Sequence, residues 1–181
     1  MWSLQSPGAR TEGWQSQQIS AAALGSSDIP WPRSGSGPAV ALDRTPESVA
    51  YFLACRVTPM EFHTATHNGK VRGYFMLAHA PSQVRIVDLH VDSDDSNDWA
   101  AVARLAVAQA KLDESAAEVV AMAGDPINSQ GLAACGFHAR GDYPLRIFTS
   151  PDIQFPDKPL RYQMLDGDGA YLHENKPDFW A

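Results

Sequence analysis

The chain has 181 residues, a formal net charge of −7 and a hydrophobic content of 44%. This length supports one domain, with or without a tail, and a core that removes roughly 70% of the unfolded surface from water. The acidic balance argues against binding to nucleic acid or to an anionic membrane. No window approaches ~18 consecutive apolar residues, so the sequence predicts no membrane-spanning helix.

The two cysteines, Cys55 and Cys135, both lie in apolar stretches and do not form a disulfide framework. We interpret both as reduced, buried side chains. The N-terminus has no basic segment followed by an apolar one, so no secretory signal is expected. A cytoplasmic location fits these features best.

Residues 1–42 differ in composition from the rest of the chain. They are rich in Ser, Gly, Gln and Ala, and Pro30-Trp31-Pro32 interrupts any regular element. We predict a flexible segment with a short helix over residues 15–24. The segment also carries three tryptophans, which either dock on the domain or on a partner, or are scattered exposed aromatics without a role: Trp2, Trp14 and Trp31.

The folded domain is predicted over residues 43–172, followed by a tail over 173–181. Thr45 and Pro46 are typical of a helix start and predict a helix over residues 45–56. Asn68-Gly69 suits a tight hairpin turn. The strands expected around that turn and after it cover residues 61–66, 71–78 and 84–91.

The second half of the domain alternates strand and helix. A helix over residues 98–114 and a strand over 118–123 follow strand 84–91, so the two strands should be parallel. Gly136 is expected to cap a short helix over 128–135. Later strands are predicted over 145–149 and 161–165. The predicted fold is α/β, with a mixed, mainly antiparallel sheet flanked by helices.

An acidic loop joins strand 84–91 to the next helix. Ser96 or Asn97 is expected to cap that helix, and acids in its first turn suit the helix dipole. An EF-hand calcium site is disfavoured because Asn97 and Ala103 stand where Gly and Glu are needed. The His63 and His67 pair straddles a strand and a turn, so no metal site is predicted.

The order of these elements resembles the GNAT superfamily, whose members move an acyl group from acyl-CoA to an amine. Strand 84–91 with Asp92 resembles the central strand of that family, and helix 98–114 resembles its CoA-binding helix. The run from Asn128 to Gly136-Phe137 is similar to the family's Asn, helix and Gly-Phe element. Residues 161–168 look like the aromatic strand and Gly-Asp turn of a bacterial subgroup, so the resemblance covers residues 45–172.

The resemblance implies an N-acyltransferase that uses acetyl-CoA or another acyl-CoA as co-substrate, without a metal. The acceptor would be a small-molecule or peptide amine. Asp88 would act as the base and Tyr143 as the acid that protonates the thiolate. Backbone groups of the central strand would bind pantetheine, and the loop and helix start would hold the phosphates. The implied cofactor-binding residues are Leu89, His90, Val91, Ser93, Ser96, Asn97 and Asn128.

Three features depart from the family pattern. The family's phosphate loop carries two glycines and a Gln or Arg. This loop has neither glycine nor base but four aspartates, each of which repels a phosphate by on the order of 1 kcal/mol. Leu132 stands where the family has a tyrosine, and only one predicted helix precedes the sheet.

The alternative is therefore a catalytically inactive GNAT-like domain used for ligand binding or protein assembly. A homodimer whose partner chain completes the sheet is one form of it. Asp88 would then be structural, paired with His90 or with backbone.

Overall fold

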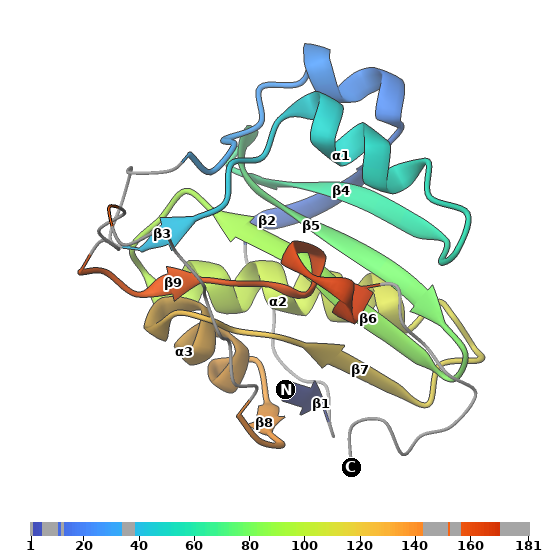
Figure 1. Ribbon diagram of the computed structural model, residues 1–181, viewed down its shortest axis with the longest axis vertical. Helices are drawn as coiled ribbons and strands as arrows, with labels where there is room; N and C mark the ends of the chain where they lie inside the picture. The colour runs from blue at the N-terminus through green and yellow to red at the C-terminus, as the bar shows by residue number, and fades with distance from the viewer. Residues whose placement is uncertain are drawn as a thin grey trace.

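The computed structural model describes residues 2–4, 11, 13–33, 39–142, 152 and 157–170, with the backbone alone for residues 2–4. The predicted fold class is confirmed: the protein is α/β, with a mixed, mainly antiparallel sheet and helices on both of its faces (Figure 1). This architecture is consistent with a GNAT-like α/β fold. Among the described residues, no helix is long and apolar enough to cross a membrane.

The main sheet has seven strands in the order β2-β4-β5-β6-β7-β1-β8. Its strands are β1 (Trp2–Leu4), β2 (Trp14–Ile19), β4 (Met60–His67), β5 (Lys70–Ala80), β6 (Gln83–Val91), β7 (Glu118–Ala121) and β8 (Phe137–Ala139). As predicted, β6 and β7 are parallel, and the other neighbours are antiparallel. A small second sheet pairs β3 (Val40–Ala41) with β9 (Leu160–Arg161).

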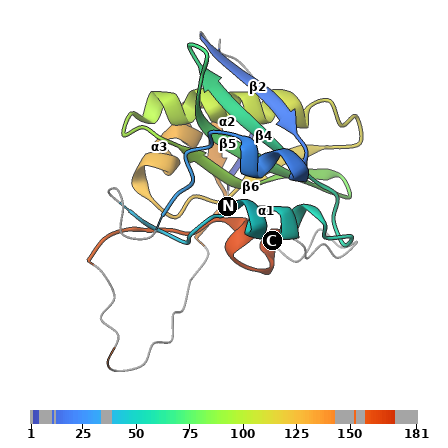
Figure 2. The same cartoon turned by 90° about the horizontal axis from the view of Figure 1, so that it is seen from above.

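The helices divide between the two faces of the sheet (Figure 2). One face is covered by α2 (Ser96–Ala110) and α3 (Pro126–Ala134). The other is covered by α1 (Pro46–Leu53) and by the short 3-10 helices η1 (Ala21–Ser26), η2 (Met164–Asp166) and η3 (Asp168–Ala170). Each face has its own apolar cluster, so the sheet is buried on both sides.

Several local predictions are confirmed. The Thr45 side chain accepts a hydrogen bond from the Ser48 amide at the start of α1, where Pro46 is the first helical residue. Asn68 and Gly69 have φ values of 51° and 78°, as a tight hairpin turn requires. Two helices are shorter than expected, because α1 ends at Leu53 and α2 at Ala110.

The predicted helix over residues 15–24 is wrong, and so is a domain that starts only at residue 43. Residues 14–19 form β2, the edge strand beside β4, and η1 follows. Trp14 stacks on His67 with ring centroids 4.8 Å apart, and Trp31 packs against Phe62 and Tyr74. Pairing with β4 decides the conformation here, because the helix propensity of Gln is small beside a full strand ladder.

This strand and helix also correct the expectation that only one helix precedes the sheet. Among the described residues, the strands β1, β2 and β3 and the helices η1 and α1 come before β4. Strands β1 and β8, which lie beside β7, were not predicted either. The strand predicted over residues 145–149 lies outside the described residues.

Strand β6 lies at the centre of the main sheet. Its register with β5 shifts between Met76 and Leu77, which leaves Val87 as an extra residue on β6. With β7 it pairs only from Gln83 to Ile86. The two parallel strands therefore separate beyond Ile86, and this separation positions the site described below.

Helices α2 and α3 touch at Gly131, and this contact predicts a mutational effect. A Cβ at Gly131 would lie 2.6 Å from the Cβ of Trp99. We expect Gly131→Ala to lower the free energy of unfolding by about 1–3 kcal/mol in urea denaturation, despite the better helix propensity of Ala. Gly25→Ala is the control, because a Cβ at Gly25 meets no atom within 4 Å. Equal stability of the two variants would contradict the close packing.

Candidate functional site

A stretch of chain from the C-terminal part of the sequence fills the separation between β6 and β7. We call residues 157–170 the C-terminal segment; it comprises β9, η2 and η3. In Figure 1 it crosses in front of the sheet, beside β6. A Cβ at Gly124, just after β7, would lie 2.4 Å from the backbone nitrogen of Tyr162. The backbone of the C-terminal segment therefore packs directly on the end of β7.

Gln163 joins this segment to the free side of β6. Its side-chain Oε1 accepts a hydrogen bond from the Leu89 amide at 2.8 Å, and its Nε2 donates to the Leu89 carbonyl at 2.9 Å. The primary amide thus bonds Leu89 as a neighbouring strand would. The sequence assigned backbone groups of Leu89, His90 and Val91 to pantetheine. In this structure, a side chain of the protein itself satisfies those of Leu89.

Asp88 lies next to Leu89 and is 1% exposed. Its Oδ2 accepts hydrogen bonds from Arg44 at 2.8 Å and from the Tyr74 hydroxyl at 3.1 Å. Its Oδ1 accepts from Nε2 of Gln163 at 2.7 Å. Burial, together with the charge of Asp88, raises the pKa of Tyr74 well above its usual range, so this hydroxyl stays protonated as a donor. The carboxylate is therefore held on three sides.

Arg44 extends this network to the C-terminal segment. Its guanidinium bonds both Asp88 and Asp166, and all three side chains are less than a tenth exposed. Burial alone would lower the pKa of Arg44, but the two carboxylates outweigh it and raise that pKa. Burial also raises the pKa of Asp166. The predicted pairing of Asp88 with His90 is not observed, since the partners of Asp88 are Arg44, Tyr74 and Gln163.

The loop after β6 is closed by its own hydrogen bonds. Asp95, rather than the predicted Ser96 or Asn97, is the N-cap of α2, and its side chain accepts from the Asn97 amide at 2.9 Å. An aspartate competes well for this position because its oxygen is charged and the helix N-terminus is positive. Ser93 donates to Asp98 at 2.6 Å. A carboxylate thus occupies the helix end expected to hold phosphate.

A pocket of about 210 Å³ opens beside the end of β6. Three of the predicted cofactor-binding residues, His90, Val91 and Ser93, line it. The walls opposite come from the segment around Trp31 and from β3, and Arg161 of β9 lines it too. The structure therefore brings part of the predicted site together, with lining residues that sequence analysis did not assign.

His90 is the most unusual group of the pocket. Burial, together with the nearby cations Arg161 and Arg44, lowers its pKa to about 3. The imidazole is therefore neutral at physiological pH. Its Nδ1 is buried and has no hydrogen-bond partner among the residues that the structure describes.

Three further predicted site residues, Ser96, Asn97 and Asn128, do not line this pocket. Ser96 is the first residue of α2, and neither Ser96 nor Asn97 lines the pocket. Asn128 is buried in the first turn of α3, where its amide donates to Asp125, the N-cap of that helix. Tyr143 lies outside the described residues.

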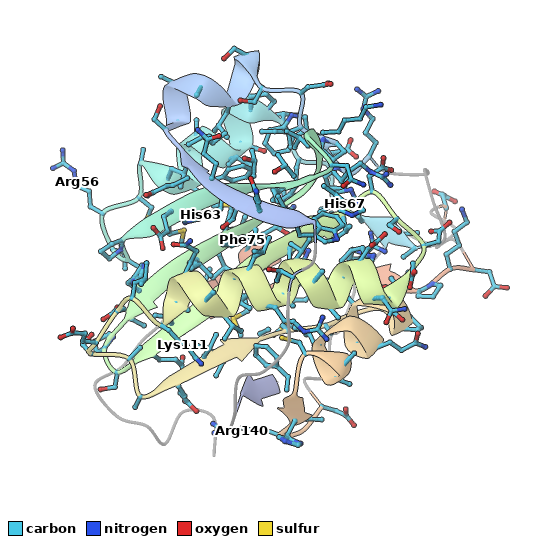
Figure 3. All side chains as sticks on the ribbon, turned by 180° about the vertical axis from the view of Figure 1, so that it is seen from behind. Arg56, His63, His67, Phe75, Lys111 and Arg140 are labelled. Carbon is cyan, nitrogen blue, oxygen red and sulfur yellow. The ribbon has the colours of Figure 1, made fainter. Side chains whose placement is uncertain are left out.

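The histidines of β4 and β5 form a separate cluster on the face covered by α2. His79 contacts Asp113 at 2.9 Å through Nδ1 and Glu61 at 3.1 Å through Nε2. His63 lies 3.3 Å from Glu61 and stacks on Phe75, beside which Figure 3 labels it. Within the described ranges, no group of three or more His, Cys, Asp or Glu side chains is arranged to hold a metal ion.

Comparisons with known proteins return no match: no protein-family model, no curated protein and no solved structure is significantly similar to this chain. The class defined here is therefore the one that fold and site give by themselves. It is an α/β domain with a separated pair of parallel strands, which a C-terminal segment of the chain fills.

We expect the hydrogen bonds of Gln163 to contribute strongly to the stability of the folded protein. In Gln163→Leu, the Leu89 amide, the Leu89 carbonyl and Asp88 each lose a buried partner. We expect the free energy of unfolding in urea to fall by about 3 kcal/mol. Gln18→Leu, at an exposed position of β2, should change it by less than about 0.5 kcal/mol. A loss at Gln163 no larger than at Gln18 would show that these bonds do not hold the segment.

The His79 cluster predicts a pH dependence of stability. Partial burial lowers the pKa of His79, but hydrogen bonds to Asp113 and Glu61 outweigh it and raise the pKa above 6.5. The stabilisation is thus complete below pH 6.5 and is lost as the pH rises through the folded-state pKa. Wild type should exceed His79→Gln by about 1 kcal/mol at pH 5.5 and by less at pH 8.5 in urea denaturation. The exposed His138→Gln is the control, and a difference that grows with pH would refute this assignment.

Proposed function

We propose that this chain is a GNAT-like domain that does not transfer acyl groups and instead binds a small ligand in the pocket at the end of β6. One observation carries the proposal: the amide of Gln163 bonds both backbone groups of Leu89 and also Asp88. An acyl-CoA that entered this separation would have to displace all three bonds.

The other groups that an acyltransferase would use are also engaged in contacts within the chain. Asp88 accepts bonds from Arg44 and Tyr74 as well, so three of its roughly four acceptor positions are taken, and the residue is only 1% exposed to a substrate amine. At the phosphate end, Asp95 already bonds the first turn of α2. Together these contacts favour a structural role for residues that would otherwise bind and activate substrates.

Ligand binding is supported by the pocket itself. It is lined by a buried cation, by a neutral His90 and by the aromatic side chain of Trp31, which are typical of small-molecule sites. Its volume of about 210 Å³ suits a ligand much smaller than a whole acyl-CoA. We further propose a reducing, cytoplasmic compartment, which fits the free thiols of Cys55 and Cys135.

A second candidate is an acyltransferase whose C-terminal segment leaves when acyl-CoA binds. The specific observation in its favour is the separation of β6 and β7 beyond Ile86, with a bulge at Val87. That geometry suits an extended amide chain such as pantetheine. The acceptor would then be a small-molecule or peptide amine.

Titration with acetyl-CoA separates the two candidates. We expect wild type to show no change in melting temperature with 1 mM acetyl-CoA, because its binding groups are satisfied within the chain. A ligand at 100 times its Kd would add about 2.7 kcal/mol, which corresponds to several degrees. ADP serves as the control for unspecific phosphate effects.

Gln163→Leu tests the second candidate in the same assay, since it removes the bonds that acyl-CoA would have to displace. Saturable stabilisation of wild type by acetyl-CoA, with none by ADP, would overturn the proposed function. Stabilisation of the Gln163→Leu variant alone would favour a segment that acyl-CoA displaces.

A further inference from the structure

We propose that the pocket at the end of β6 binds a small zwitterion of the free α-amino acid class, its carboxylate toward Arg161 and its ammonium toward Asp92 and Asp94. This inference rests on the proposed ligand-binding function and names its ligand. It comes from the charges that line the pocket, which include both signs: Arg161 is buried, whereas Asp92 and Asp94 are exposed.

The buried end of the pocket is suited to a carboxylate. The Arg161 side chain is 9% exposed, and its Nε donates to Asp125 at 2.7 Å. Its guanidinium lies 4.5 Å from the ring centre of Trp99, so this cation is fixed in position. Asp125 contacts Arg161 a second time, because its Oδ1 accepts from the guanidinium at 3.5 Å and also from the amides of Ile127 and Asn128. Two of the five N–H donors of Arg161 therefore point at Asp125, and the pocket is lined by a guanidinium with further donors.

His90 supports the same sign of potential. The positive charge of Arg161 is one cause of its low pKa, after burial. A ligand carboxylate at this end would meet the same positive potential from Arg161.

The open end of the pocket carries acids. Asp92 and Asp94 are both exposed, and the side chain of Asp92 is 69% exposed. The nearest cation to Asp92 is Arg72, whose Nε lies 3.9 Å from the carboxylate. The two carboxylates of this rim favour an ammonium group. Arg33, which is also exposed, lines the pocket next to Trp31 and Pro32.

The two simpler ligand classes fit less well. A plain anion would meet repulsion from Asp92 and Asp94, and a plain cation would meet repulsion from Arg161. A zwitterion of small size satisfies both sets of charges. The apolar wall of Trp31 and its neighbouring prolines then leaves room for an aliphatic or aromatic side chain.

Isothermal titration of the full chain with a panel of free L-amino acids tests this inference. We expect at least one to bind saturably, and to bind at least tenfold more tightly than either its decarboxylated amine or its deaminated acid. No binding by any amino acid up to about 10 mM would overturn the proposal. Equal binding of the deaminated acid or of the amine would overturn the zwitterion assignment.

Matched variants locate the site. Asp94→Asn should weaken the tightest amino acid by about tenfold. Asp142→Asn is the charge-matched control outside the pocket, and Arg56→Gln, at a residue that projects away from the body of the protein in Figure 3, is a second control. Equal effects of pocket and control variants would overturn the location. Acetyl-CoA in the same titration reports on the proposed function separately, so the two failures are distinguishable.

Discussion

The hydrogen bonds between Gln163 and Leu89 are the constraint on which the rest of the site depends. Two parallel strands that separate leave backbone groups without partners, and a buried unpaired amide or carbonyl costs about 1–3 kcal/mol. Here a side-chain amide supplies one donor and one acceptor in the required places. The separated strands are therefore stable without a ligand, because no cofactor is needed to satisfy these backbone groups.

The Gln163 side chain also links the Leu89 backbone to the buried charged residues. Because Gln163 also donates to Asp88, the C-terminal segment, the centre of β6 and Arg44 form one network. Arg161, two residues earlier, lines the pocket beside His90. The run from Arg161 to Gln163 therefore contributes both to the lining of the pocket and to the docking of the segment. The separation between β6 and β7 is thus filled by the C-terminal segment, whereas the small pocket at the end of β6 is open.

Much of the fold could be predicted because its signals are local. The Thr45 cap, the Asn68-Gly69 turn and the strand-helix-strand run around α2 depend on neighbouring residues. Strand β2 was missed because its stability comes from pairing with β4, whose paired residues lie 43 to 53 positions later in the sequence. Gln163 could not be assigned either, since a lone glutamine gives no sign that it will meet a backbone 74 residues earlier. His90 and Val91, which the resemblance assigned to the end of the central strand, line the pocket, whereas Arg161, which also lines it, was not assigned from the sequence.

Amide hydrogen exchange at Leu89 tests the central claim most directly, because this amide is the one that Gln163 bonds. We predict that NMR-detected exchange of this amide in wild type is as slow as in the ladder between β4 and β5. In Gln163→Leu it should accelerate at least tenfold relative to that ladder, which corrects for global destabilisation. Fast exchange at Leu89 in wild type, or an unchanged ratio in the variant, would contradict a cleft closed by the C-terminal segment.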